Sequence, residues 1–365
     1  MFLKLTKTIS GCVAVSILVF LVFFTNLTHA QGELVEKFEV KMISDSAAHN
    51  AFTDLIRYKK HFYCAFRVAC DHAPNDSCSN GAIKIIRSKR GKKWETVALL
   101  SSERYDFRDP KLSIMPDGKL MILMGGSEYR RSALLSRLSH YSFSKDGVRF
   151  SEPKPVVIQS SIKSPYDWVW SITWHDTTGY AALYQINKPN YKWDVVLLKT
   201  YDGIHYDSII QWDLGPRPNE ARIRFAPDGR MLILVRRESG GNGILGISDP
   251  PYTDWHWHNL SMKLGGPNFI VLDNEKILIG SRIFTDEKLL PILKNKKEKD
   301  KTGIFLASIN GEIRKVVELP SGGDTSYPGM LIHKKYLYIT YYSSHDGKSK
   351  IYFAKAKLID IENEF

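Results

Sequence analysis

Hydrophobic and polar residues alternate along this chain in short stretches that are typical of β-strands. Stretches such as HFYCAFR (61–67) and RMLILVRRE (230–238) are apolar at every second position or throughout, and each follows a tight turn. A period of two places side chains on opposite faces of a sheet, whereas a helix requires a period of about 3.6. Helix-period segments are hard to find in this sequence, so the pattern predicts an all-β fold.

A unit of strands recurs six times along the chain. In each unit an apolar strand, a tight turn, a second apolar strand and a third strand follow one another, usually with a fourth. The first strands begin near Asn50, Asp109, Trp170, Glu220, Pro267 and Tyr327. These starts lie roughly fifty to sixty residues apart, which suits one four-stranded blade of a β-propeller.

The two ends of the repeat region complement each other. The sixth unit stops after its third strand, SKIYFAKAKL (349–358), and a spare strand, LVEKFEVKMI (34–43), precedes the first unit. If the spare strand completes the sixth unit, the ring closes and no sheet edge stays open. A β-sandwich or several small β domains is the alternative, but neither predicts six units and one displaced strand. We therefore expect a single six-bladed β-propeller domain over residues 31–365, with the N-terminal strand closing the last blade.

Residues 1–30 have the pattern of an export signal. Lys4 and Lys7 form a basic start. Val13–Phe24 is an apolar run, and Thr28-His29-Ala30 offers small residues where signal peptidase reads them. The rival interpretation is a transmembrane anchor, for which the run is short. We expect a signal peptide cleaved near Ala30, no membrane span after its removal, and a secreted or periplasmic protein.

The net charge of the chain limits the classes of ligand that it is expected to bind. The formal charge is +12, or +10 once Lys4 and Lys7 are removed with the signal. Basic residues are scattered, and the densest run, Lys294–Lys301, also carries acidic residues. We therefore expect no nucleic-acid partner, and only a bias toward acidic ligands.

The mature chain keeps three cysteines, Cys64, Cys70 and Cys78. They are too few for a disulfide scaffold and lack the CxxC spacing of a zinc site. Either Cys70 and Cys78 form one local bridge while Cys64 is buried, or all three are free thiols.

Polar residues gather at one end of the predicted strands. In a propeller the start of each first strand and the end of each second strand meet at the same mouth of the central channel. The first strands begin with His49, Asn50, Arg108, Asp109, Asp167, Trp168, Asn219, Glu220, Asn268, Asp324 and Tyr327, and the second strands end with Arg67, Tyr129, Asn187, Arg236, Arg237, Glu238, Arg282 and Tyr342–His345. The opposite ends carry plain turns such as Pro116-Asp117-Gly118. Any one such residue more often belongs to an ion pair or a solvated strand end, but their repetition in every blade predicts a functional pocket.

The chemistry of this mouth suits an acidic sugar. An arginine presents a planar fork that pairs with a carboxylate through two hydrogen bonds. Carboxylates and a tyrosine can protonate a glycosidic oxygen and stabilise an oxocarbenium-like centre. Trp168, Trp170 and Tyr129 can stack on sugar faces. The sequence shows no phosphate-cradling loop, no Ser-His-Asp nucleophile elbow and no zinc motif.

Over nearly its whole mature length, the sequence resembles the sialidase (neuraminidase) superfamily of six-bladed propellers. Sialidase Asp-boxes read approximately Ser-x-Asp-x-Gly-x-x-Trp and lie between the third and fourth strands of a blade. Ser144–Phe150 and Thr200–Tyr206 resemble shortened boxes, and Ser88–Trp94 resembles a more degraded one with Arg90 in place of the aspartate. The resemblance implies a structural role for these segments and no catalytic one.

The segment from Asn219 to Arg237 carries the resemblance further. In the family a glutamate opens the fourth blade, and an arginine of the carboxylate-binding triad ends the next strand. Glu220 and Arg236 match that spacing. Because side chains alternate along a strand, only one of Arg236 and Arg237 can face the channel. The other pairs with Glu238 or with solvent.

Two more segments resemble the family's site. Arg282 ends the equivalent strand of blade five and is similar to another triad arginine. Ser326–Leu331 resembles the segment that bears the family's tyrosine nucleophile, which implies this role for Tyr327. A tyrosine hydroxyl has an ordinary pKa of about 10, so it needs a base, and Glu220 is the implied proton acceptor.

The sequence also departs from the family. The first triad arginine opens blade one in the family, but Asn50–Leu55 stands here without an arginine, and Arg67 or Arg108 is the candidate to supply that charge. The glutamate expected after the last blade's second strand is absent, and Ser343–Asp346 stands in its place. The acid/base aspartate, expected after the second strand of blade one, is Asp71, with Asp109 as its competitor.

The resemblance implies a secreted exo-glycoside hydrolase that removes a terminal, acidic, sialic-acid-like sugar from a glycan. The expected catalytic residues are Glu220, Tyr327, Asp109 and Asp71, and the expected substrate-binding residues are Arg67, Arg108, Arg236, Arg237, Arg282, Asn50, Trp168, Asp324 and Tyr342. We expect a monomer that acts on a glycan or glycoconjugate and uses no metal or organic cofactor. The alternatives are a non-catalytic glycan- or peptide-binding propeller, and a glycosidase or lyase for another uronic-type sugar.

Overall fold

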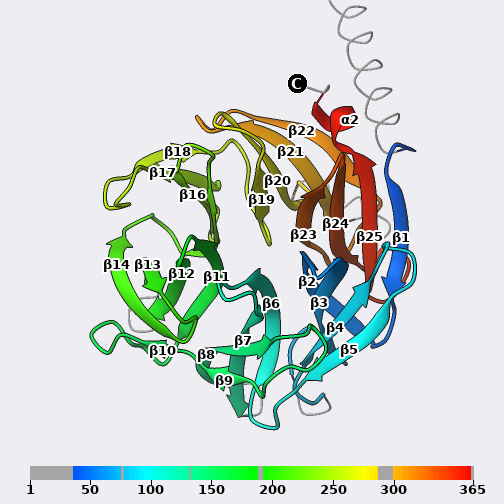
Figure 1. The fold of residues 1–365 in the computed structure, drawn as a ribbon, viewed down its shortest axis with the longest axis horizontal. Coiled ribbons are helices and arrows are strands. Elements are labelled where there is room, and N and C mark those ends of the chain that lie inside the picture. The colour runs from blue at the N-terminus through cyan, green and yellow to red at the C-terminus, as the bar shows by residue number, and fades with distance from the viewer. Residues whose placement is uncertain (1–35, 75–77, 131–132, 188–191, 287–298, 363–365) are drawn as a thin grey trace, which may run out of the picture.

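The computed structural model describes residues 36–74, 78–130, 133–187, 192–286 and 299–362 (Figure 1). The expected signal peptide, residues 1–30, lies outside the described residues. Among those that are described, no helix has the length and apolar character needed to cross a membrane. The short helix α2 (Leu358–Glu362) follows the last strand.

Six sheets stand around a central axis as the blades of a propeller, which confirms the predicted fold (Figure 1). Blade one is β2 (His49–Tyr58), β3 (His61–Ala69), β4 (Ala82–Ser88) and β5 (Glu95–Leu100). Blade two is β6 (Asp106–Ile114), β7 (Leu120–Arg130), β8 (Ala133–Ser144) and β9 (Lys154–Pro155). Blade three is β11 (Asp167–His175), β12 (Thr178–Asn187), β13 (Lys192–Thr200) and β14 (His205–Trp212), with β10 (Val157–Ile158) added in parallel to β14.

The other half of the ring is built in the same way. Blade four is β15 (Pro218–Phe225), β16 (Met231–Arg237), β17 (Ile244–Ser248) and β18 (His256–Asn259). Blade five is β19 (Asn268–Val271), β20 (Lys276–Ile283), β21 (Lys301–Ser308) and β22 (Ile313–Leu319). Blade six is β23 (Thr325–His333), β24 (Tyr336–Ser343), β25 (Lys350–Lys357) and β1 (Glu39–Ser44).

The first strand of the described chain closes the ring, as the sequence predicts. β1 pairs antiparallel with β25, so that Glu39 faces Lys355 and Lys41 faces Phe353. Blade six is therefore made from both ends of the chain. This pairing covers an edge of β25 that would otherwise be open.

Apolar clusters fill the spaces between neighbouring blades. Between blades one and two, Ile83 and Ile85 belong to the same buried cluster as Ile122 and Met124. Corresponding clusters join each later pair of blades, including blade six with blade one. Because the inner strands of each blade bury both faces in this way, they are apolar along most of their length, and their polar groups concentrate at the strand ends.

The first strands of four blades each carry a residue other than glycine with a positive φ at a β-bulge. Phe52, Asp109, Glu220 and Tyr327 have φ values of 60°, 52°, 46° and 50°. The strand register shifts at each of these points. A positive φ is uncommon for residues other than glycine and costs about 1–3 kcal/mol, and such residues concentrate at functional sites. A bulge also redirects the side chain that it carries.

Two turns between third and fourth strands share one hydrogen-bonding pattern. In blade two, Oδ1 of Asp146 accepts from the backbone N–H groups of Val148 and Arg149 at 2.9 and 2.8 Å. In blade three, Asp202 receives the backbone N–H groups of Ile204 and His205 in the same way. These are the segments that resemble Asp-boxes, and their aspartates hold the turns rather than face the channel.

Candidate active site

The centre of the candidate site is a hydrogen bond between Tyr327 and Glu220. The Tyr327 hydroxyl donates to Oε1 of Glu220 across 2.6 Å. Nη1 of Arg236 donates to the same oxygen across 2.5 Å, and the backbone N–H of Gly266 donates to Oε2 across 2.9 Å. The Glu220 side chain is only 7% exposed. Both oxygens of this carboxylate are thus held by donors, and one of them is held against the tyrosine.

Burial keeps the proton on the tyrosine. Burial raises the pKa of the Tyr327 hydroxyl well above its ordinary value, and the neighbouring Glu220 carboxylate raises it further. The positive charges of Arg236 and Arg282 act in the opposite direction on this pKa. Because the hydroxyl is protonated at neutral pH, it can act as a nucleophile only if a base accepts the proton. Glu220 is the carboxylate placed to accept it.

Arg282 joins this centre from blade five. Its Nε donates to the backbone oxygen of Thr325 at 3.0 Å, and its Nη2 donates to the hydroxyl oxygen of Tyr342 at 3.2 Å. The Tyr342 hydroxyl in turn donates to Oδ1 of Asp324 across 2.7 Å. The Arg282 guanidinium also lies 5.9 Å from the centre of the Tyr327 ring. Three expected substrate-binding residues, Arg282, Tyr342 and Asp324, therefore form one network beside the tyrosine.

Arg108 and Asp109 reach the site from blade two. Nε of Arg108 lies 3.3 Å from Oδ2 of Asp109, and these side chains are 13% and 8% exposed. The Arg108 guanidinium stands over the ring of Phe52 at 4.8 Å, and that ring is 4.9 Å from the Tyr327 ring. Burial raises the pKa of the Asp109 carboxyl, an effect that Arg108 and Lys111 oppose. A buried carboxyl with a raised pKa has the properties of a general acid.

The consecutive arginines of β16 point to different places, as the strand alternation predicts. Arg236 contacts Glu220, and its Nη2 also lies 3.1 Å from Oε1 of Glu238. Arg237 instead donates to the backbone oxygen of Asn242 at 2.6 Å. Glu238 therefore pairs with Arg236. In the sequence analysis, Glu238 is a candidate partner for the arginine that faces away from the channel, which is Arg237.

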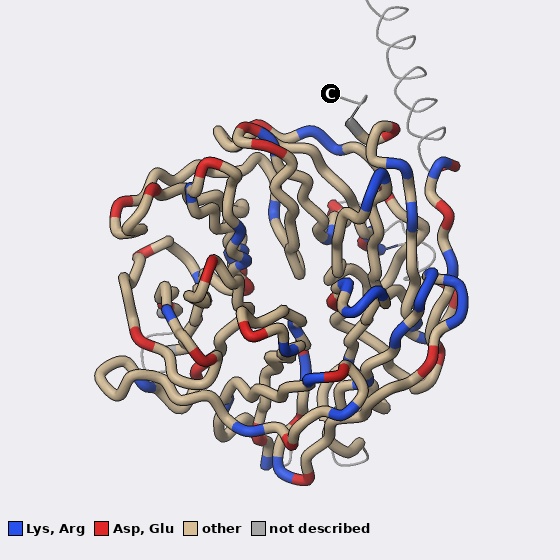
Figure 2. The backbone as a smooth tube through the Cα atoms, in the orientation of Figure 1, with Lys and Arg blue, Asp and Glu red and all other residues tan. Residues whose placement is uncertain are grey.

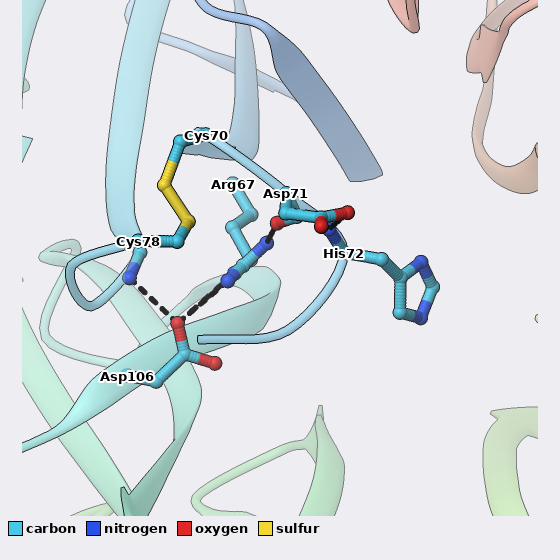
Figure 3. The surroundings of a disulfide bond; sticks show 7 residues. Arg67, Cys70, Asp71, His72, Cys78 and Asp106 are labelled. Atoms are coloured by element: carbon cyan, nitrogen blue, oxygen red, sulfur yellow. Dashed lines mark hydrogen bonds and ion pairs between the residues drawn. A yellow bond between two sulfur atoms is a disulfide. The ribbon is translucent and has the colours of Figure 1, made fainter. Parts of the chain in front are cut away.

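Arg67, expected to bind substrate, holds a loop instead (Figure 3). Its guanidinium is fully buried, with Nη2 2.7 Å from Oδ1 of Asp106 and Nη1 2.8 Å from the backbone oxygen of Asp71. The Cys70–Cys78 disulfide closes the same loop, which settles the two predicted cysteine states, and Cys64 is buried and free. Because Arg67 has no exposed surface, Arg108 is the remaining candidate for the charge that blade one lacks.

The loop places His72 against Phe52 of blade one and Asp324 of blade six. Asp71 is exposed, and its Oδ1 accepts from the backbone N–H of His72 at 2.6 Å. The imidazole of His72 projects from the loop on the side away from the disulfide (Figure 3). Its ring lies 5.4 Å from that of Phe52.

Asn50 and Trp168 are also enclosed in the fold. Asn50 has no exposed surface and donates to the backbone oxygen of Ser349, which ties blade one to blade six. Trp168 is 2% exposed and stacks on Tyr184 within blade three. These contacts stabilise the blades, so neither side chain offers a surface to a ligand as the sequence analysis expected.

Two histidines converge on Asp324, an arrangement that the sequence does not predict. Nε2 of His49 and Nδ1 of His72 lie 3.0 and 3.1 Å from the same oxygen, Oδ2 of Asp324. Burial alone would raise the pKa of this carboxyl, but the hydrogen bonds from the two histidines lower it below its ordinary value on balance. The three residues come from the start of β2, the disulfide-closed loop and the start of blade six. His49 and Asp324 are 275 residues apart, so no local spacing signals the cluster.

Charged groups also lie deeper in the channel. Nη2 of Arg222 in β15 is 3.0 Å from Oδ1 of Asp54 in β2, and both side chains are buried. Nζ of Lys111 stands 4.3 Å over the ring of Trp170. In the sequence, the available signal was that charged residues occur inside the first strands and not only at their ends.

A groove with a basic lining adjoins the site. It has a volume of about 940 Å³, and its lining includes five basic residues, Arg236, Arg237, Lys263, Arg282 and Lys299, and three acidic ones, Glu238, Asp286 and Asp300. A second cavity of about 400 Å³ lies against Arg282, Lys299 and Asp324. Elsewhere the basic residues are spread around the ring rather than gathered in one arc (Figure 2). The lining of the groove therefore favours an acidic ligand at this place.

Solved structures with this fold include sialidases. A sialidase of Trypanosoma rangeli in complex with sialic acid matches 90% of this chain with a TM-score of 0.63 and 13% identity, and phage phi92 endosialidase matches 88% with a TM-score of 0.64 and 10% identity. A protein of unknown function from Dyadobacter fermentans matches 88% with a TM-score of 0.71 and 16% identity. This chain spans 58% of the trypanosomal chain, 69% of the phage chain and 99% of the Dyadobacter chain. No protein-family model and no curated protein matches the sequence. At these identities the structural matches show a sialidase-like propeller fold and nothing finer.

Proposed function

From the premise of a sialidase-like propeller, we propose that this protein is a glycoside hydrolase that removes a terminal acidic sugar from a glycan. The hydrogen bond between Tyr327 and Glu220 is the observation that carries the proposal. It joins a partly buried nucleophile to a buried base at the mouth of the channel. The adjoining groove shares Arg236 and Arg282 with this centre, and it carries more basic than acidic residues, which suits an acidic sugar.

The residues of the site divide the reaction between them. The oxygen of Tyr327 attacks the anomeric carbon while Glu220 accepts its proton. Asp109 gives a proton to the leaving glycosidic oxygen, because its carboxyl is buried and its pKa is raised. Water then cleaves the bond between the sugar and Tyr327, with Asp109 as the base that accepts a proton from the water, and Glu220 returns its proton to the released Tyr327 oxygen.

Arg236, Arg282 and Arg108 are the proposed partners of the sugar carboxylate. They approach from blades four, five and two. Arg236 donates to Glu220, Arg282 lies 5.9 Å from the centre of the Tyr327 ring, and Arg108 stands over the Phe52 ring, which adjoins that of Tyr327. A carboxylate held by several guanidinium groups is fixed in direction as well as in place. This fixes the anomeric carbon relative to Tyr327.

A panel of aryl glycosides tests this proposal. It contains α-sialosides, α- and β-uronides and neutral hexosides, and release of the phenol is measured with the mature chain from Gln31 onward. Turnover of an acidic glycoside, with no turnover of its neutral counterpart, supports the proposal. Binding of acidic glycans on an array without any turnover would overturn it in favour of a glycan-binding propeller.

One observation favours a second candidate substrate. Phe52 occupies the bulge of blade one, where the resemblance predicts an arginine for the sialic-acid carboxylate. A uronic-type sugar, whose carboxylate is attached differently to the ring, is therefore the second candidate, cleaved by a glycosidase or a lyase. A lyase would release an unsaturated sugar, which its ultraviolet absorption distinguishes from a hydrolysis product.

We also propose that the protein is exported. Cleavage near Ala30 is supported by the basic start at Lys4 and Lys7, the apolar run Val13–Phe24 and the small residues in Thr28-His29-Ala30. Mass spectrometry of the secreted protein tests this, because cleavage gives a mature N-terminus at Gln31, or within a few residues of it.

A further inference from the structure

We propose that His49, His72 and Asp324 bind a divalent transition-metal ion, with Zn²⁺ as the reference ion, at the rim of the candidate active site. This binding site is separate from the roles proposed for Tyr327 and Glu220. It concerns binding of an ion, so it can be tested whether or not the protein hydrolyses glycosides.

The geometry of the three side chains is the main argument. One ligand atom from each residue, Nε2, Nδ1 and Oδ2 in turn, lies within 4.8 Å of the others, and both nitrogens are 3.0–3.1 Å from the oxygen. Zn²⁺ binds histidine nitrogen and carboxylate oxygen at about 2.0–2.2 Å, which places neighbouring ligands about 3.3 Å apart in a tetrahedral site. The two nitrogen–oxygen distances therefore lie within a few tenths of an ångström of this separation, and the two nitrogens lie within 4.8 Å of each other.

The kinds of ligand indicate the class of ion. Two imidazole nitrogens and one carboxylate oxygen suit Zn²⁺, Co²⁺, Ni²⁺ or Fe²⁺, whereas Ca²⁺ and Mg²⁺ prefer oxygen ligands alone. The side chains of His49, His72 and Asp324 are 11%, 50% and 33% exposed. Three protein ligands with access to solvent leave a position for water or for an oxygen of a bound sugar.

The cluster is fixed by its surroundings. Tyr342 donates to Oδ1 of Asp324 across 2.7 Å, which leaves Oδ2 for the cluster. Hydrogen bonds of this kind orient metal ligands, and their loss typically costs about 10–100-fold in affinity. The Cys70–Cys78 disulfide closes the loop that carries His72. The three ligands thus come from three segments that the fold holds in place.

Two arginines beside the His49–His72–Asp324 cluster repel a bound cation. Nη2 of Arg108 is 3.5 Å from Nε2 of His72, and Nη2 of Arg282 is 3.6 Å from Oδ1 of Asp324. Asp109 offsets the charge of Arg108. Repulsion from the two guanidinium groups weakens binding relative to a site without them, so the ion must be supplied in the titration rather than expected to survive purification.

Titration with Co²⁺ and Zn²⁺ tests the proposal on the untagged mature protein after treatment with a chelator. The proposal predicts visible Co²⁺ absorption that saturates at one ion per chain, disappears when Zn²⁺ is added, and is matched by a rise in melting temperature with Zn²⁺. His72→Ala and Asp324→Asn are each expected to weaken binding by at least tenfold, and Tyr342→Phe by about tenfold.

His205 provides the matched control. Its Nδ1 lies 2.8 Å from Oδ2 of Asp202, so it forms a histidine–carboxylate pair on the outer part of blade three without a second histidine. His205→Ala should leave Co²⁺ binding unchanged. The proposal is wrong if the protein shows no saturable binding, or if folded His72→Ala and Asp324→Asn variants bind as the wild type does. The melting transition of each variant without metal shows whether it is folded.

Discussion

The hydroxyl of Tyr327 in blade six lies 2.6 Å from the carboxylate of Glu220 in blade four, although 107 residues separate them in the sequence. Each residue has a positive φ at a bulge in the first strand of its blade. Blade five, which stands between them, supplies the Gly266 N–H group that holds the carboxylate from its other side. Closure of the ring and two local distortions thus place one nucleophile against one base.

The choice between Asp109 and Asp71 as the acid can be tested with leaving groups of different pKa. Asp109→Asn is expected to slow the cleavage of glycosides with a poor leaving group by about 10²–10⁴-fold, because the departing oxygen then lacks its proton. The kcat/KM of a nitrophenyl glycoside should fall much less, since kcat/KM reports the steps up to release of the leaving group and nitrophenolate departs without a proton. Asp71→Asn should change neither rate by more than a few fold. If Asp71→Asn shows the leaving-group dependence and Asp109→Asn does not, the roles are reversed.

The buried pair of Asp54 and Arg222 should stabilise the ring across the channel. Arg222→Met leaves the Asp54 carboxylate buried without its partner, which should cost about 3–5 kcal/mol of unfolding free energy in urea denaturation. The surface pair of Arg230 and Asp228 is the control, and Arg230→Met should cost about 0–1 kcal/mol. Equal losses in both variants would show that the Asp54–Arg222 pair contributes no more than an exposed pair.

Lys111 gives a pH dependence of stability with a definite sign. Burial lowers the pKa of its ammonium group to about 8, although the neighbouring Asp109 and Asp54 carboxylates oppose this shift. Lysine in the unfolded chain titrates near 10.4. Between these values the unfolded state binds more protons, so this contribution to stability rises with pH and is lost as the pH falls through 8.

Replacement of the lysine isolates this effect. The unfolding free energy of the wild type, relative to that of Lys111→Met, should increase between pH 8 and pH 10.4, because the variant has no ammonium group there. Denaturant unfolding at several pH values measures the difference. Parallel curves for the two proteins would show that the ammonium group titrates normally in the fold.

The Cys70–Cys78 disulfide should stabilise the loop that carries His72. It joins cysteines eight residues apart, and a bridge across so short a loop contributes about 2–3 kcal/mol by restricting the unfolded chain. A Cys70→Ser, Cys78→Ser variant should melt at a lower temperature and bind Co²⁺ more weakly. A reductant should lower the melting temperature of the wild type and leave the variant unchanged. An unchanged wild type in fully reducing conditions would contradict this account.

The blades were predictable because strand alternation repeats along the whole chain and only the sixth unit lacked a fourth strand. The pairing of β1 with β25 followed from that deficit. Glu220, Arg236, Arg282 and Tyr327 could be gathered at one mouth because strand ends alternate between the two openings of the ring.

The details of the site could not be predicted in the same way. The residue types of Phe52 and Tyr327 do not predict their positive φ values, because glycine is the residue that usually adopts this backbone conformation. A shift of one residue along a strand moves a side chain to the other face. The sequence does not give the register of β11, in which Trp168 packs against Tyr184 instead of facing the channel. The convergence of His49 and His72 on Asp324 depends on the meeting of blades one and six.

Glu220→Gln tests the central claim most directly, with melting temperature and turnover measured on the same sample. Glutamine keeps the shape and can accept the Gly266 hydrogen bond, but it cannot take the proton of Tyr327. A catalytic base predicts a loss of turnover of about 10²–10⁴-fold in a protein that still folds and binds its ligand. A purely structural ion pair with Arg236 predicts a loss of stability of about 3–5 kcal/mol with unchanged turnover per folded molecule. A destabilised but fully active Glu220→Gln variant would contradict the assignment of Glu220 as the base.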